Sequence, residues 1–297
     1  MTAETADRVV AASPPARRMS HRSRRRLLAA GRIALVIFFV LFACFPMYWM
    51  ILTALSPLGA SRGTSQPLVP TAITLQNFAY VFTQVELARW LTNSILIATL
   101  VAGGATFFGA MAGYSLARHS FRWTSLFVTA IIATQLMPPT SIIIPIYRMA
   151  LATGLLNTYT ALVIAHLTDV LPISIFLLRG FFTSIPREIE QAALTEGATQ
   201  WGVLRRITLP LAAPGLATVF IYAFVVSWND LLYARTLTSS SRIWTAPVGL
   251  ASFSGEYYTL FEPLMAAALI FALPVTIVFL ALQRHFVHGL TVGGVKG

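Results

Sequence analysis

Carboxylates that could do chemistry are scarce in the apolar part of this sequence. Asp169 is the only one clearly inside a long apolar run, and His166 precedes it by one helical turn. A charged group in hydrocarbon is costly and is usually retained for proton relay, substrate contact or helix packing. An aspartyl dyad would need two such carboxylates, so the sequence disfavours membrane protease chemistry. We expect Asp169 to form a helix-packing hydrogen bond with His166, and substrate contact is the alternative.

Other reactive patterns are missing from the sequence. No cluster of His, Cys and Asp has metal-ligand spacing. The one lysine, Lys296, is followed by Gly297, so the phosphate-binding motif GxxxxGK[ST] cannot occur. The one cysteine, Cys44, lies in an apolar run and can form no disulfide within the chain. The sequence therefore predicts no catalytic, metal-binding or cofactor-binding residue in this chain.

The composition points to the lipid bilayer as the solvent. Of the 297 residues, 57% are hydrophobic and only 10% are charged, against about 25% charged in soluble domains. A mean hydropathy of +0.73 cannot be hidden inside one water-facing surface. The net charge of +11 would suggest nucleic acid in a soluble protein. Here the basic residues cluster by loop, so we predict membrane lipid and no nucleic acid as a partner.

Long runs between charged residues predict an all-α, polytopic membrane protein with six transmembrane helices. Each run can hold the ~20 residues that a spanning helix needs. The predicted spans are Ile33 to Leu55, Thr92 to Leu116, Leu126 to Tyr147, Tyr159 to Phe181, Leu211 to Leu232 and Leu264 to Gln283.

The loops that carry Arg and Lys predict the orientation of the chain. Arginines cluster before the first span, and most others follow the second and fourth spans or the sixth. Since basic residues are retained on the cytoplasmic side, both termini are predicted to be cytoplasmic in a multi-pass protein of the cell membrane. Residues 1–32 are predicted to form a disordered basic arm near anionic lipid. A cleaved signal peptide is disfavoured because no A-x-A site follows the first apolar run.

Prolines and small residues add two features to these spans. A proline removes a backbone donor and kinks a helix, which is typical of a moving transport pathway. The prolines within the spans are Pro138, Pro139, Pro145, Pro172 and Pro274. In the second span, small residues recur every four positions and predict close approach of another helix, in this chain or in a partner. They are Ala105, Gly109, Gly113 and Ala117.

The loop of residues 183–210, between the fourth and fifth spans, predicts two short helices joined by a turn. Ser184 can cap the first helix, with Pro186 in its first turn. Gly197 suits the end of that helix, Thr199 can cap the second, and Pro210 ends it before the next span.

This loop resembles the EAA loop in the membrane subunits of binding-protein-dependent ABC importers. The matching segments are Gln191-Ala192-Ala193, Gly197 and Ile207-Thr208-Leu209-Pro210. The rest of the chain, from about Ile33, is similar to the carbohydrate branch and its maltose-type second permease subunit. That wider similarity is carried by Leu136-Met-Pro-Pro, Ile144-Pro-Ile-Tyr147, Leu177-Leu-Arg-Gly-Phe-Phe182, Trp228-Asn-Asp230 and Gly289-Leu-Thr-Val-Gly-Gly-Val-Lys-Gly297.

The resemblance implies a type I ABC importer permease fold, with a permease domain over 33–285 and a glycine-rich cytoplasmic tail over 286–297. It implies import of a sugar or oligosaccharide. The partners would be a homologous second permease subunit, an ATPase dimer that holds ATP and Mg, and an extracytoplasmic sugar-binding protein. The alternatives are the same machine with glycerol phosphate, peptide or polyamine as cargo, or a stand-alone secondary carrier.

Three sets of site residues are predicted, the first two from the resemblance and the third from the residue types within the spans. The ATPase-coupling loop comprises Glu190, Gln191, Ala192, Ala193, Glu196, Gly197, Ala198, Ile207, Leu209 and Pro210. The tail at the ATPase interface comprises Gly293, Gly294 and Lys296, and the translocation path comprises Asp169, Tyr222, Trp228 and Asn229. Gln191 stands where the family has Glu, so an ion pair to the ATPase becomes a hydrogen bond at most. Glu190 is one residue away and points about 100° from Gln191 around a helix.

Overall fold

The computed structural model describes residues 21–60, 68–69, 72–119, 122–255 and 259–293. The chain divides into two units, Met1–Trp49 and Met50–Gly297. The prediction of an all-α fold is confirmed: among the described residues, extended pairing is limited to one isolated bridge between Ser254 and Thr259.

Helix α1 (His21–Ala54) contains the first predicted span, since Ala30–Ala54 is apolar enough to cross a membrane. It begins twelve residues before Ile33, so the prediction of disorder up to residue 32 is wrong for residues 21–32. Arg, Leu and Ala are all good helix formers, and a helix that the bilayer stabilises extends readily through them. The rest of the predicted arm, residues 1–20, lies outside the described residues.

Three more of the predicted spans are single helices. They are α3 (Leu87–Arg118), α6 (Tyr159–Ser184) and the apolar part, Phe261–Ala281, of α13 (Phe261–Gly293). The other two spans belong to bent pairs. Helices α4 (Thr124–Thr134) and α5 (Pro139–Ala152) meet at 94°, and the segment Gln200–Leu211 meets α10 (Ala213–Asn229) at 73°. Six spans result when each bent pair counts as one.

The break between α4 and α5 has a local steric cause. Pro138 precedes Pro139 and is held extended, with ψ at 137°, because the second ring clashes with helical backbone before it. A single proline is better tolerated: Pro145, Pro172 and Pro274 all lie inside continuous helices. Of the prolines predicted to kink the spans, the adjacent pair Pro138 and Pro139 lies at the 94° break between α4 and α5.

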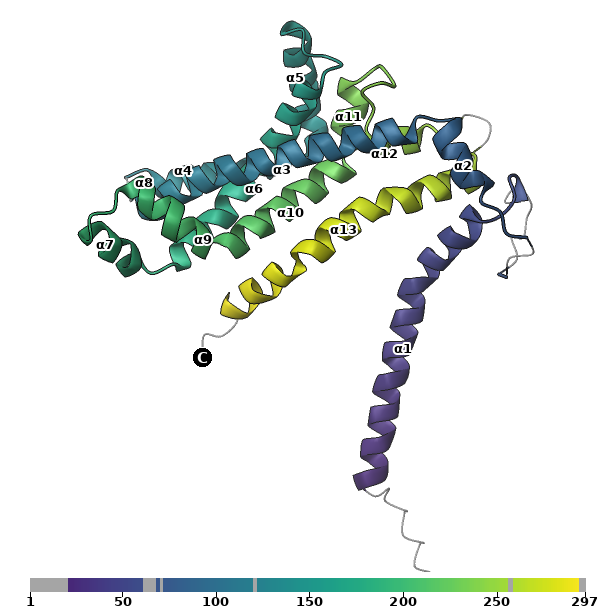
Figure 1. The fold of residues 1–297 in the computed structure, drawn as a ribbon, viewed down its shortest axis with the longest axis horizontal. Coiled ribbons are helices and arrows are strands. Elements are labelled where there is room, and N and C mark those ends of the chain that lie inside the picture. Colours follow the sequence, from purple (N-terminus) through teal and green to yellow (C-terminus); the bar gives the residue numbers. More distant parts are fainter. Residues whose placement is uncertain (1–20, 61–67, 70–71, 120–121, 256–258, 294–297) are drawn as a thin grey trace, which may run out of the picture. The chain divides into compact units, whose positions relative to one another are not determined.

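Helices α3, α6 and α10 form the centre of the second unit, and α13 packs against α10 (Figure 1). The predicted small-residue face of α3 packs on α6, within this chain. A Cβ atom added to Gly109 would lie 3.2 Å from Ser174 Cβ, and one added to Gly113 would lie 2.9 Å from the backbone nitrogen of Arg179. These two glycines therefore allow the α3 and α6 backbones to approach closely.

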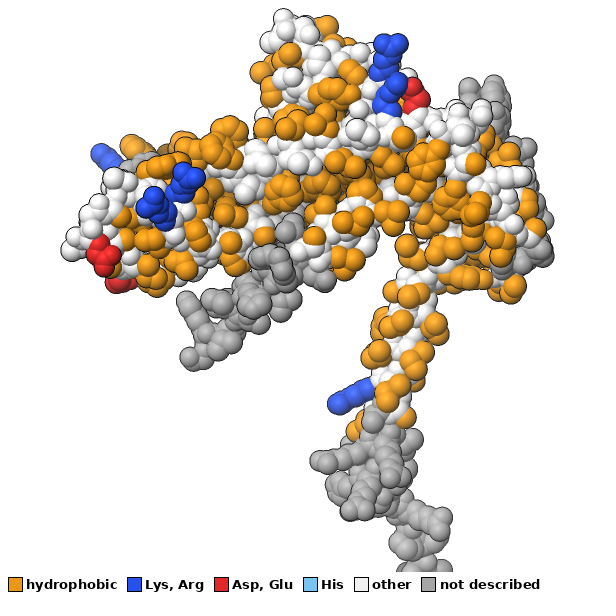
Figure 2. Space-filling model, in the orientation of Figure 1, with side chains coloured by type: hydrophobic (Ala, Val, Ile, Leu, Met, Phe, Trp, Pro, Cys, Tyr) orange, Lys and Arg blue, Asp and Glu red, His pale blue; other side chains and the backbone are white. Residues whose placement is uncertain are grey.

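Much of the outer surface of the second unit is apolar. Figure 2 shows hydrophobic side chains over most of the drawn face, with charged side chains near α7 and α8. Phe107 and Phe108 of α3 are more than half exposed. Lipid or another apolar protein surface must cover such a face.

The two ends of α3 carry different structures. Near Arg118 lie the short helices of the 183–210 loop. Near Leu87 lie α2 (Gln76–Thr83) and α12 (Ala246–Ala251), whereas α11 (Leu232–Leu237) contacts α5 and α6. At the Leu87 end, Asn93 Nδ2 donates to the carbonyls of Arg242 (3.0 Å) and Trp244 (2.9 Å). These bonds fix the connection between α11 and α12 on α3.

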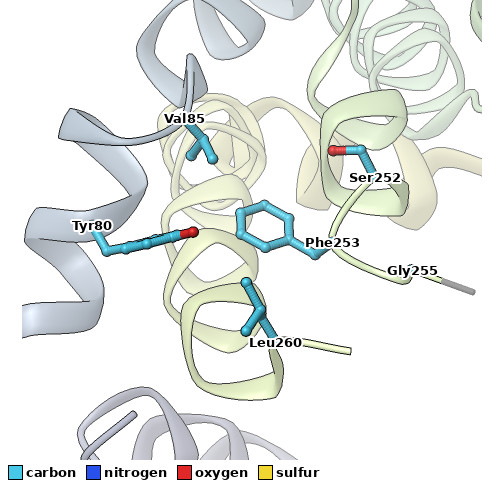
Figure 3. A pocket seen from close by; sticks show the side chains of 6 residues that line it. All are labelled: Tyr80, Val85, Ser252, Phe253, Gly255 and Leu260. Carbon is cyan, nitrogen blue, oxygen red and sulfur yellow. The ribbon is translucent and has the colours of Figure 1, made fainter. Parts of the chain in front are cut away.

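A pocket of about 230 Å³ opens at this same end, between α2 and the connection from α12 to α13. Tyr80 and Phe253 point toward each other across it, with Val85 and Leu260 beside them (Figure 3). Only the hydroxyls of Tyr80 and Ser252 are polar among the lining side chains. Among the described residues, this pocket presents few of the polar groups that a small-molecule site needs.

Candidate functional site

The helix, turn, helix element predicted between the fourth and fifth spans is present. Its first helix is α7 (Arg187–Thr195). The second consists of α8 (Gln200–Val203), the π-helical segment η2 (Leu204–Thr208) and α9 (Leu209–Leu211). Gly197 lies between them with φ at +90°, a value that favours glycine. Thr199 caps α8 by accepting a hydrogen bond from the Gly202 amide at 3.1 Å, as predicted.

Two predicted boundaries of this element are wrong. Ser184 does not cap α7; it ends α6, and its hydroxyl donates to the Phe181 carbonyl at 2.8 Å. Ile185 is extended because it precedes Pro186, so α6 stops there and α7 begins after the proline. Pro210 does not end the second helix, since it occupies the first turn of α9, where a proline is tolerated. The chain bends one residue later, after Leu211.

Most of the predicted coupling residues face outward. Gln191, Ala192, Glu196, Gly197, Ala198 and Pro210 are exposed, and Ala193, Ile207 and Leu209 are half-buried. Apolar side chains share the exposed surface of the two short helices: Ile189, Leu194 and Trp201 are 42%, 40% and 60% exposed. This surface, the coupling face, is defined by Ile189, Gln191, Ala192, Leu194, Glu196, Gly197, Ala198 and Trp201.

Glu190 departs from the prediction, because it points inward and does not belong to the coupling face. It is 7% exposed and accepts two hydrogen bonds from Arg118, both at 2.9 Å. The hydroxyl of Thr208 donates to it at 2.8 Å and that of Tyr114 at 3.4 Å. Gln191 is exposed, so the two neighbouring side chains lie on different sides of α7, and the partner of the Glu190 charge is Arg118.

The predicted tail is partly helical. Helix α13 continues through Gly289 to Gly293, so the predicted glycine-rich tail is helical up to that point. One glycine inside a helix costs about 1 kcal/mol, which does not end a helix that has a long apolar stretch before it. Gly294 and Lys296 lie outside the described residues.

A second polar cluster lies between α6, α10 and α11. His166 Nδ1 lies 2.7 Å from Ser227 Oγ, and Nε2 lies 3.1 Å from Asp230 Oδ2. The predicted pairing of His166 with Asp169 is therefore wrong. Asp230 was not identified from the sequence as a member of this cluster, although an Asp just ahead of a helix can accept hydrogen bonds from its first amides. It accepts hydrogen bonds from the amides of Tyr233 and Ala234 at the start of α11.

Asp169 lies between two small pockets of about 110 and 130 Å³, and Tyr233 also lines both. No donor among the described residues lies within hydrogen-bond distance of the Asp169 carboxylate. Asn229 lines the first pocket, and Gln135 and Thr168 line the second. This arrangement offers an acceptor and several neutral polar groups to a ligand with hydroxyl groups.

The aromatic residues predicted for the path differ in position. Trp228 is 1% exposed and its ring stacks on those of Phe224 and Phe271, with centroids 5.7 and 5.0 Å away. Trp228 therefore belongs to the core and not to a path surface in this conformation. Tyr222 is half-buried on α10.

The order Ser227, His166, Asp230 has the donor and acceptor pattern of a hydrolase triad, but its surroundings do not suit hydrolysis. Ser227 is 5% exposed within α10 and does not line the adjacent pocket. A nucleophile must reach its substrate. These three side chains instead hold α11 and α10 on α6.

The bent span pairs, the close α3 to α6 contact and the surface helix pair define a multi-pass helical membrane protein. The comparisons with known proteins identify the family. Residues 105–292 match the family described as "Binding-protein-dependent transport system inner membrane component", and the chain belongs to it.

Individual relatives match nearly the whole chain. The trehalose transport system permease protein SugB of Mycobacterium tuberculosis is 35% identical over 86% of this chain and 93% of its own. The arabinooligosaccharides transport system permease protein AraQ of Halalkalibacterium halodurans is 32% identical over 88% and 94%. A chain of a bacterial ABC transporter involved in the import of the acidic polysaccharide alginate has the same fold. Its TM-score is 0.77 at 22% identity, with 91% of this chain and 99% of that chain covered.

Proposed function

We propose that this chain is one of two membrane subunits of an ATP-driven importer for a sugar or oligosaccharide. The names of the similar permeases support the cargo, since they specify trehalose and arabinooligosaccharides. The chain itself lacks a phosphate-binding motif, so ATP hydrolysis belongs to a partner. An extracytoplasmic binding protein delivers the cargo, and a homologous permease covers the apolar faces of α3 and α13.

The coupling face is the main observation that supports an ATPase partner. A surface helix ordinarily buries its apolar side chains and exposes its charged ones. Helix α7 departs from this pattern, because Ile189 is exposed and Glu190 is buried, while Leu194 is 40% exposed at the edge of the pocket beside Glu190. Exposed apolar side chains beside the small Ala192 and the turn at Gly197 fit a groove on another protein. The side of the membrane that carries this face is the cytoplasm, which the arginine distribution supports.

The polar pockets at Asp169 support a cargo path. Sugar hydroxyls donate to carboxylates and exchange hydrogen bonds with amides. Asp169 and Asn229 supply such groups where the α4 to α5 break and the end of α10 leave space. Tyr222 lies on the same helix as Asn229. The residues beyond Gly293, which include Gly294 and Lys296, are proposed to reach the ATPase.

Reconstitution tests this function directly. The complex is placed in proteoliposomes with ATP inside and the cognate binding protein outside, and accumulation of a labelled oligosaccharide is followed. We expect accumulation that requires ATP and the binding protein and that a proton ionophore does not reduce. Accumulation without ATP that the ionophore abolishes would indicate a secondary carrier. Transport of peptide, polyamine or glycerol phosphate in place of sugar would refute the proposed sugar cargo. It would still support an ATP-driven importer.

A further inference from the structure

Helix α7 is attached to the rest of the molecule in an unusual way. Among its nine residues the only buried side chain is the carboxylate of Glu190. The other α7 side chains are exposed, apart from the half-buried Ala193. Burial of apolar side chains normally holds a surface helix in place. The position of α7 therefore depends on polar bonds, which are those of Glu190 and one from Arg187 Nη2 to the Ala117 carbonyl at 3.0 Å.

Arg118 makes the strongest of these bonds. Its Nε donates to Oε2 and its Nη2 to Oε1 of Glu190, and the two side chains are 8% and 9% exposed. A bidentate pair of this kind fixes both distance and direction. Within the part of the chain that the structure describes, it is the one buried pair between an arginine and a carboxylate.

The same carboxylate reaches a third element. Thr208 Oγ1 donates to Glu190 Oε1 at 2.8 Å, and Thr208 is fully buried in η2, which leads into α10. Arg118 is the last residue of α3 and also donates to the Ile185 carbonyl at 3.2 Å. Glu190 thus joins the end of α3, the helix α7 and the approach to α10.

Apolar packing does not provide an alternative attachment. A pocket of about 180 Å³ lies beside the bonds between α7 and the end of α3, and Tyr114, Arg118 and Glu190 are among its lining residues. Breaking a buried ion pair leaves an uncompensated charge, so the pair resists separation when one of its elements is displaced. A displacement of α7 is then passed to α3 and α10 and is not absorbed in the pocket.

We propose that Glu190 is a positioning residue that transmits movement of α7 to the transmembrane helices through Arg118 and Thr208. The proposal rests on the proposed function, in which α7 docks on an ATPase. Glu190 itself touches no partner; it sets how far the membrane helices follow the coupling face.

The test compares Glu190→Gln with Glu188→Gln in the reconstituted complex. Both substitutions remove one negative charge from α7, but Glu188 is exposed. Glu190→Gln should retain the ATPase and the second permease, while the oligosaccharide imported per ATP hydrolysed falls roughly tenfold. Glu188→Gln should behave as wild type. An unchanged import ratio in Glu190→Gln would overturn the proposal, and so would loss of the ATPase from that complex, because Glu190 would then act in docking.

A double variant tests the pairing and removes the risk of a buried lone charge. Arg118→Gln combined with Glu190→Gln should lose no more transport than either single variant, because all three remove the same connection. Losses that multiply in the double variant would show that the two residues act separately and would contradict the proposal.

A labelling experiment separates failure of this proposal from failure of the proposed function. Ala193→Cys is introduced into a chain in which Cys44 is replaced by Ser, and its reaction with a maleimide is timed in membranes without ATP or binding protein. Glu190→Gln should raise the rate several-fold because α7 loosens, and Glu188→Gln should not. Equal rates would overturn the role of Glu190 whatever the cargo or energy source of the transporter.

Discussion

Replacement of Gly113 by Ala tests the close contact between α3 and α6. The added Cβ would lie 2.9 Å from the Arg179 backbone nitrogen and 3.1 Å from Leu178 Cβ. Carbon atoms pack at about 3.5–4 Å, so the two helices must separate by roughly 0.5 Å at this point. The nearest atom belongs to the backbone and cannot rotate away.

The expected effect has two parts of opposite sign. Overpacking costs about 1–3 kcal/mol, and Ala regains up to about 1 kcal/mol through its higher helix propensity. We therefore expect the free energy of unfolding to fall by about 1–2 kcal/mol. Gly103→Ala is the matched control, because Gly103 lies in the same helix with no atom within 4 Å of an added Cβ. That substitution should be neutral or slightly stabilising.

The measurement is thermal unfolding of the purified variants in one detergent. A difference of about 2 kcal/mol between Gly113→Ala and Gly103→Ala corresponds to roughly 4–8 °C in Tm. Equal melting temperatures for the two variants would show that α3 and α6 are not in close contact at Gly113. The account of the small-residue face would then be wrong.

Three further predictions concern the proposed function. Cysteine at Gln84, tested without Cys44, should react with an impermeant maleimide in intact cells and cysteine at Thr199 should not; the reverse pattern would invert the proposed topology. Gly197→Val should reduce uptake and ATPase co-purification, because positive φ costs a β-branched residue about 1 kcal/mol or more. Gly197→Asn should keep both, since Asn tolerates positive φ. Equal uptake and co-purification in the two variants would show that function does not depend on the conformation of this turn. Asp169→Asn should raise the KM of sugar uptake roughly tenfold, through loss of a charged hydrogen-bond acceptor, with ATP hydrolysis retained; an unchanged KM would remove Asp169 from the path.

Local rules predicted the features whose causes are local. The spans follow from hydropathy, since the bilayer stabilises a long apolar helix independently of the residues that pack against it. The break before Pro139 follows from sterics between adjacent residues. The turn at Gly197 and the cap at Thr199 likewise need only the residues beside them.

Pairings across the fold were less predictable. His166 was expected to bond Asp169, three residues away, but both of its ring nitrogens bond residues of the 227–230 segment. Side chains three apart share a helix face, yet a partner on a packed helix can approach the ring more directly. The contact between α6 and α10 that brings Asp230 to His166 joins positions 64 residues apart. The periodicity of residues within one helix cannot predict a contact between residues of two different helices.

Helix α7 shows how the environment of a helix changes the interpretation of its sequence. By the usual amphipathic pattern, Ile189 would be assigned to the buried side of α7 and Glu190 to the solvent side. The structure reverses this because Arg118, 72 residues earlier, ends α3 directly beneath α7 and its charge requires a partner. Burying Glu190 leaves Ile189, about 100° around the helix, exposed to water, which is unfavourable for its apolar side chain. The internal ion pair and the apolar coupling face are thus two consequences of one helix rotation, and a partner that covers the face would also favour the rotation that keeps the pair intact.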